Sequence, residues 1–101
     1  MMQDVSLQIT DNEFHRQFET EIDGEKAKIE YASQERKIFL TKVVMSDELK
    51  EKGMMNDFIE QVLAIIEERN VRVVPTSPDI AKFMRSNKLK YKSMLPAGIA
   101  L

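Results

Sequence analysis

Residues 38–55 read IFLTKVVM followed by SDELKEKGMM, and the spacing of the apolar residues changes between the two halves. The first half is nearly continuously apolar and rich in β-branched residues, which predicts a central strand covered on both faces. From Met55 the apolar residues recur three and four positions apart, which predicts an amphipathic helix from about Met54 to Arg69. Residues 46–53 are therefore expected to form a loop that joins a buried strand to a helix.

Three shorter runs precede this segment, at about residues 5–9, 14–22 and 27–31, and each alternates apolar with polar residues. Alternation of this kind is typical of half-buried strands. Asp23-Gly24 lies between the second and third runs and is a strong signal for a two-residue hairpin. We expect the aromatic side chains to lie in the core: Phe14, Phe18, Phe39, Phe58 and Phe83.

Downstream of the long helix, Val71–Pro75 predicts one more buried strand. Ser77-Pro78-Asp79 predicts a helix start, with a serine cap, a proline at the first helical position and an acid in the first turn. A helical connection between the fourth and fifth strands favours parallel pairing of the two. The order is therefore β-β-β-β-α-β-α, an α/β (α+β) fold with a mixed, mostly antiparallel sheet. We expect one domain over residues 1–95 and a loose or partner-docked tail over 96–101.

Composition excludes several classes of function. The chain has 101 residues, 43% of them hydrophobic and 32% charged, a balance typical of one globular domain. The net charge of −2 disfavours nucleic-acid binding, and the absence of cysteine excludes disulfides and thiolate catalysis. His15 is the only histidine, so no metal cluster is expected. Neither a membrane span nor a secretory signal is evident, and we expect a cytoplasmic protein.

The segment Ser46 to Met55 resembles the loop that binds the acetyl-CoA pyrophosphate in the GNAT superfamily of N-acetyltransferases. The resemblance to small single-domain members of that superfamily extends over about Glu13 to Leu95. Phe14 to Tyr31 looks like their opening hairpin, and Val73 to Ser77 looks like the strand after their long helix.

Several positions depart from the family pattern. Lys50 stands where the family has glutamine or arginine, Gly53 keeps the middle glycine, and Met55 replaces the last small residue. Glu51 replaces a frequent glycine, and Ser77 aligns with a cysteine near the acetyl group.

The resemblance implies an acetyl-CoA-dependent transferase that acetylates an amine directly. The acceptor is a small molecule or a protein lysine or N-terminus, and the protein is a monomer or homodimer. The alternative is a degenerate module of the same fold that binds a protein partner. We expect Ser77 near the acetyl group, although capping alone also explains this serine. Tyr91 is a candidate for proton transfer, as are His15, Glu30 and Tyr31, and the sequence does not rank them. The expected cofactor-binding residues are Met45, Lys50, Glu51, Lys52, Gly53, Met54 and Met55.

Overall fold

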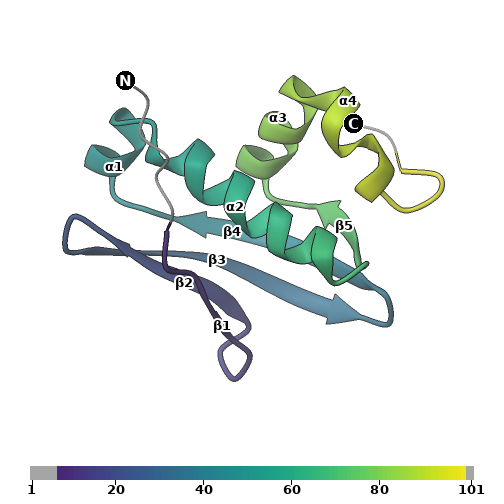
Figure 1. Cartoon of the computed structure of the whole chain (residues 1–101), viewed down its shortest axis with the longest axis horizontal. Helices are drawn as coiled ribbons and strands as arrows, with labels where there is room; N and C mark the ends of the chain where they lie inside the picture. The colour runs from purple at the N-terminus through teal and green to yellow at the C-terminus, as the bar shows by residue number, and fades with distance from the viewer. Residues whose placement is uncertain (1–6, 100–101) are drawn as a thin grey trace.

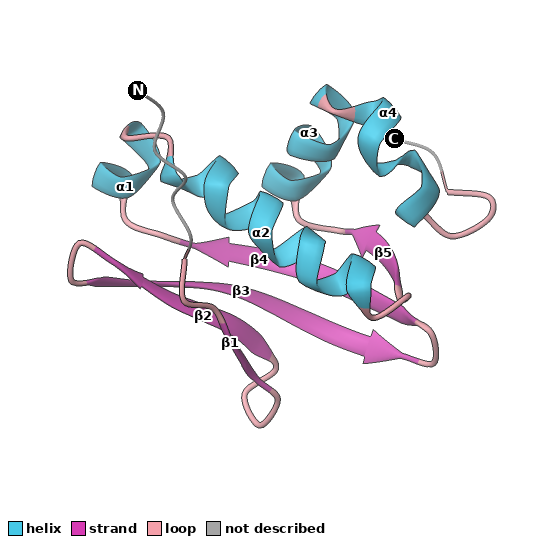
Figure 2. Ribbon diagram, in the orientation of Figure 1, coloured by secondary structure: helices cyan, strands magenta, loops and turns pink. Residues whose placement is uncertain are grey.

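The fold is a five-stranded sheet with all its helices on one face, as the computed structural model of residues 7–99 shows (Figures 1 and 2). The sheet order is β1-β2-β3-β4-β5, the same as the chain order. The elements are β1 (Thr10–Asn12), β2 (Gln17–Ile22), β3 (Glu25–Gln34), β4 (Lys37–Val44), α1 (Asp47–Glu51), α2 (Met54–Glu68), β5 (Arg72–Pro75), α3 (Pro78–Ser86), α4 (Lys88–Tyr91) and a 3-10 turn η1 (Lys92–Met94).

The strand pairings agree with the sequence prediction. β2 and β3 form an antiparallel hairpin around Asp23 and Gly24, whose φ angles of 54° and 79° are both positive. Positive φ at both central residues matches the right-handed twist of the flanking strands. β4 and β5 pair in parallel from Lys37↔Arg72 to Leu40↔Pro75, with α1 and α2 forming the crossover.

β4 contains a bulge that changes which residues face the helices. Glu30 pairs with Lys42, but the next residue of β3, Tyr31, pairs with Leu40, so Thr41 is an extra residue. The buried positions are therefore Ile38 and Leu40 before the bulge and Val43 and Met45 after it. Helices cover the strand on one face only, contrary to expectation. The apolar run is nearly continuous because Phe39 and Val44, half-buried on the helix-free face, lie between these buried positions. Thr41 and Lys42 are exposed.

The core lies between the sheet and α2, whose observed bounds agree with the predicted helix. The helix contributes Phe58, Ile59, Val62, Leu63 and Ile66, each at most 1% exposed. Ribbons of α3 and α4 lie on the same side of the sheet as α2 (Figure 2). Among residues 7–99, no helix is both long and apolar enough to span a membrane.

Phe14 was expected in the core, and this prediction is wrong: its side chain is 89% exposed. It lies in the turn before β2, where the His15 N–H donates to the Asn12 side chain at 3.1 Å and Arg16 has a φ of 55°. These local features delay the start of β2 to Gln17.

Three other segments differ from expectation. The first strand is β1 at Thr10–Asn12 rather than at about 5–9, and residues 5 and 6 lie outside the described part. The predicted loop at 46–53 contains α1, and the segment after Asn87 forms α4 and η1. Within the predicted tail, Pro96 is buried, and residues 100–101 are outside the description.

Candidate functional site

β4 and β5 run together for four residues and then separate. The pairing ends at Leu40↔Pro75. β4 continues to Val44, whereas the chain after Pro75 turns away from β4. The Leu40 carbonyl accepts bonds from the Ser77 N–H at 2.8 Å and the Thr76 hydroxyl at 3.0 Å. Within residues 7–99, no strand pairs with the rest of β4 on this side. Its backbone groups there can pair with an extended ligand.

Ser77 lies at the point where β4 and β5 separate; we call the space beside the unpaired part of β4 the β4–β5 gap. It is 2% exposed, and its Oγ accepts the Ile80 N–H at 3.5 Å as the cap of α3. The predicted cap, with Pro78 at the first helical position, is therefore confirmed. A serine hydroxyl has one hydrogen to donate in addition to its acceptor lone pairs. Capping thus leaves this side chain able to donate to a ligand in the gap.

The expected phosphate loop is a short helix followed by a tight turn. The Ser46 Oγ caps α1 by accepting the Leu49 N–H at 3.2 Å. The N–H groups of Lys50, Lys52 and Gly53 donate to carbonyls of Ser46, Glu48 and Lys50 at 3.0–3.3 Å. Those three donors are already used within the chain, so they are not free to bind an anion.

Gly53 precedes α2 as its N-cap residue, has a φ of 80° and provides no side-chain cap. The first N–H groups of a helix, here those of Met54, Met55 and Asn56, have no acceptor within the helix. They carry the positive end of the helix dipole, which favours an anion.

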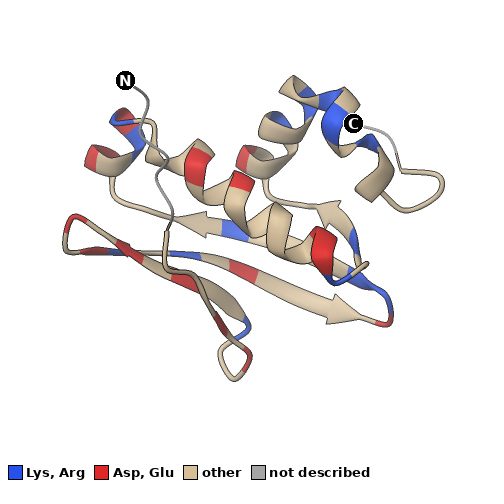
Figure 3. Cartoon of the chain, viewed as in Figure 1, with Lys and Arg blue, Asp and Glu red and all other residues tan. Residues whose placement is uncertain are grey.

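The charges around the start of α2 are mixed. Figure 3 shows acidic and basic residues together on α1 and the following turn. Lys50, Glu51 and Lys52 are all exposed, and the Lys52 Nζ lies 3.3 Å from a carboxylate oxygen of Asp23. Surface pairs of this kind are weak, so Lys52 can exchange partners at little cost.

Tyr91 is buried in the helical layer. It is 3% exposed, and its ring centroid lies 5.7 Å from that of Phe83. Burial raises the pKa of the Tyr91 phenol above its usual value, while the nearby Lys90 ammonium opposes this shift. The phenol is therefore protonated at neutral pH and can donate a hydrogen bond.

The other three proton-transfer candidates lie before β2 and on β3, where Glu30 is opposite Lys42 of β4. His15 is exposed in the turn before β2, and Glu30 is paired with Lys28 at 3.2 Å. The Tyr31 phenol donates to an Asp11 carboxylate oxygen at 2.6 Å. Burial, followed by this hydrogen bond, raises the pKa of Tyr31.

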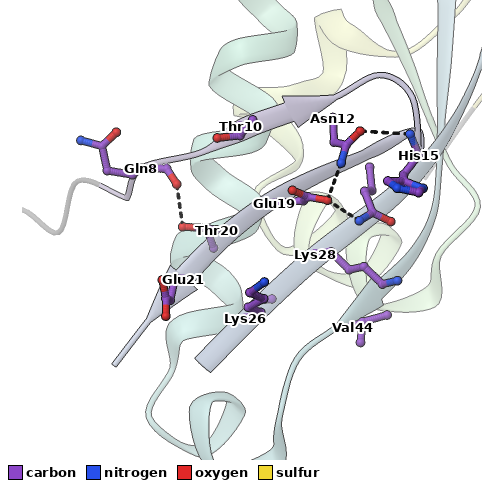
Figure 4. Close-up of a pocket in the computed structure, with 12 residues that line it drawn as sticks. Gln8, Thr10, Asn12, His15, Glu19, Thr20, Glu21, Lys26, Lys28 and Val44 are labelled. Carbon is purple, nitrogen blue, oxygen red and sulfur yellow. Dashed lines mark hydrogen bonds between the residues drawn. The ribbon is translucent and has the colours of Figure 1, made fainter. Parts of the chain in front are cut away.

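A wide groove of about 940 Å³ lies over β1, β2 and β3, and sequence reasoning did not find it (Figure 4). Glu19 lies within it and accepts hydrogen bonds from the Gln17 and Asn12 amides. These bonds lower the pKa of Glu19. The groove includes Val44 of β4, but its lining comes mainly from the first three strands and lacks the start of α2. Only the fold brings these polar residues together.

Among residues 7–99, no three acidic or histidine side chains are grouped to hold a metal ion.

Comparison with known families agrees with this geometry. The family model for GCN5-related N-acetyl-transferase matches residues 17–94, which include every element from β2 to η1. No curated protein matches the chain. Because the family match covers more than half of its length, the chain belongs to the GCN5-related N-acetyl-transferase family.

Proposed function

We propose that the protein transfers the acetyl group of acetyl-CoA to an amine, without a covalent intermediate on the enzyme. One observation carries the proposal: the part of β4 beyond Leu40 is unpaired where β5 turns away, and α2, whose start is uncapped, follows β4 in the chain. The extended, amide-containing arm of acetyl-CoA can pair with the unpaired edge of β4. Its pyrophosphate can bind the N–H groups at the start of α2.

In this proposal the N–H groups of Met54, Met55 and Asn56 bind the pyrophosphate. Lys50 and Lys52 add attraction, partly offset by Glu51. Met55 stands where the family has a small residue, and its side chain is half-buried and packs against the core. This burial supports an open approach of the pyrophosphate to the Met55 N–H.

The arm of the cofactor would lie along the end of β4 beside Met45, which is 7% exposed. When bound, acetyl-CoA supplies a thioester whose carbonyl carbon is attacked by the amine, so that a C–N bond forms as the C–S bond breaks. The Ser77 hydroxyl is suited to donate to the carbonyl oxygen, where negative charge develops. We propose Tyr91 as the proton donor to the leaving sulfur, because a phenol is protonated at neutral pH, and solvent then reprotonates it. The proton lost by the amine passes to solvent.

A matched pair of substitutions on α2 tests the binding step. Asn56→Asp places a negative charge in the first turn, where the helix dipole favours it. This change leaves folding intact but repels a pyrophosphate. Asn70→Asp makes the same substitution just beyond the other end of the helix and serves as the control.

Calorimetric titration of the two variants with acetyl-CoA and with free CoA measures the effect. We expect Asn56→Asp to weaken binding by about tenfold or more, with no drop in melting temperature, and Asn70→Asp to bind as the parent does. Equal affinities in all three proteins would contradict the phosphate site. Absence of binding by the parent at millimolar ligand would favour the degenerate, partner-binding module. Release of CoA thiol in the presence of amines then tests the transfer itself.

A further inference from the structure

Charge is divided unequally along the chain. From Ile80 to Leu101 there are five basic residues and no acidic ones, whereas the preceding 79 residues contain ten basic and 17 acidic ones. In space, basic residues are frequent on α3 and α4, while acidic residues are frequent on α1, α2 and the β2–β3 hairpin (Figure 3). Apart from Asp79 in the first turn of α3, the segment from α3 to η1 therefore forms a positive end on a molecule of net charge −2.

The positive end includes an exposed apolar residue. Leu89 is 92% exposed, and its neighbours in the chain are Lys88 and Lys90. Lys90 is partly neutralised, since its Nζ lies 3.2 Å from a Glu60 carboxylate oxygen. Lys88 and Lys92 are exposed, and they project to one side because they are one helical turn apart.

The inner side of the same segment is firmly packed. Tyr91 and Met94 are 3% and 5% exposed, and an Arg72 guanidinium N–H donates to the Ser93 carbonyl. Leu89 is therefore presented from an anchored turn rather than from a loose one. Anchoring lowers the entropy lost when a partner binds.

We propose that this basic surface, formed by Lys82, Arg85, Lys88, Leu89 and Lys92, docks an acidic segment of a partner protein that buries Leu89 in an apolar contact. The lysines and the arginine steer and orient the acidic segment, and Leu89 supplies the central desolvated contact. The proposal is independent of acetyl transfer. An acidic protein segment explains both the basic side chains and the exposed Leu89. A nucleic acid would leave Leu89 without a role, and these five residues include no aromatic side chain for base stacking.

The test is fluorescence anisotropy with a labelled peptide of glutamates flanking two central leucines. A second peptide has serines in place of the leucines. The variants are Leu89→Ser and the pair Lys88→Glu with Lys92→Glu. The control is the pair Arg16→Glu with Lys26→Glu, which makes the same charge change on exposed residues before β2 and in β3. Lys90 is left unchanged because it is paired with Glu60.

We expect the leucine peptide to bind the parent, and each surface variant to bind it about tenfold more weakly. The control pair should change the affinity by less than about threefold, because charges distant from an interface are screened. Acetyl-CoA affinity, measured in parallel, should be unchanged in every variant.

Several results would overturn the proposal. These are no binding of the leucine peptide at millimolar concentration, equal binding of the serine peptide, and no effect of Leu89→Ser. Tighter binding of single-stranded RNA or of anionic vesicles than of the leucine peptide would assign the surface to a different partner. Loss of acetyl-CoA binding in the Lys88 and Lys92 variant would assign it to the cofactor.

Discussion

Position 53 favours glycine because of its backbone conformation, not because a side chain there would be crowded. Its φ is 80°, and a Cβ placed on it would meet no atom within 4 Å. A left-handed backbone costs an L-residue about 1–2 kcal/mol, and asparagine tolerates it better than alanine. The glycine therefore shapes the turn from α1 into α2 and leaves the space beside it open.

We predict that Gly53→Ala lowers the free energy of unfolding by about 1–2 kcal/mol and that Gly53→Asn lowers it by less. Urea titration followed by circular dichroism measures both. An equal decrease in the free energy of unfolding for the two variants would show that the positive φ is not the reason for glycine at this position.

Ser77 has one role that is established by its contacts and one that is proposed. Ser77→Ala removes the cap of α3 and should cost about 1 kcal/mol, which lowers the melting temperature by roughly 4–8 °C in a domain of this size. If the hydroxyl also donates to the thioester carbonyl, kcat falls by about tenfold or more at temperatures where the variant is folded.

Ser77→Thr is the control for this position, because threonine can supply both the cap and the hydroxyl. We expect it to recover melting temperature and kcat together. If Ser77→Ala lowers the melting temperature but leaves kcat unchanged, the serine acts only as the cap of α3 and has no role in acetyl transfer.

The bulge in β4 is the feature that sets the orientation of the strand beside the gap. Before Thr41 the even-numbered residues face the helices, and after it the odd-numbered ones do. Without the bulge, Lys42 would face the core and Val43 would face solvent. The extra residue therefore keeps the ammonium of Lys42 in water.

The same substitution at two adjacent residues tests this arrangement. Val43 is 8% exposed and faces the core, whereas Val44 is half-buried on the helix-free face. We predict that Val43→Lys costs about 3–5 kcal/mol, as expected for an uncompensated buried charge, and that Val44→Lys costs less than about 1 kcal/mol. Chemical denaturation measures both, and the reverse ranking would show that the strand has no bulge.

One polar cluster joins three distant parts of the chain. Asp11 in β1 accepts from the Tyr31 phenol of β3 at 2.6 Å and pairs with Arg69, just after α2, at 2.8 Å. The Arg69 guanidinium also lies 5.7 Å from the ring centroid of Phe18. The cluster thus ties the edge of the sheet to the end of the helix that covers it.

The raised pKa of Tyr31 gives this cluster a dependence on pH. A group whose pKa is higher in the folded state contributes stability below its unfolded pKa, about 10 for tyrosine, and loses it as pH rises further. We predict that the parent loses stability above pH 10 and that Tyr31→Phe, although less stable at pH 8, loses less over the same range. Urea midpoints at pH 8, 10 and 11 provide the test, and parallel losses in the two proteins would contradict it.

The two faces of the sheet differ across the whole molecule. Helices cover one face, while the other carries the groove over β1 to β3 and directly opposed charges such as Glu19 with Lys28 and Glu21 with Lys26. Opposed pairs on an exposed face contribute about 0.2–1 kcal/mol each relative to Ala–Ala pairs, so this face is compatible with solvent.

Local chemistry explains what could be predicted from the sequence. The Asp23-Gly24 hairpin, the Ser77 cap and the amphipathic period of α2 each depend on residues only a few positions apart. The parallel pairing of β4 with β5 follows from the helical crossover between them. These local features predicted the order of the elements and carry the family resemblance.

Contacts between distant residues decided the rest. The bulge at Thr41 depends on the register against β3, and the exposure of Phe14 depends on where β2 begins to pair. Whether a loop N–H is free for an anion depends on the carbonyls that the folded turn brings near it, as at Gly53. The basic end around Leu89 exists only because α3 and α4 pack with their apolar sides inward. Sequence patterns record which groups each segment can bury, but tertiary structure alone determines which backbone donors, charges and apolar side chains are left for a ligand.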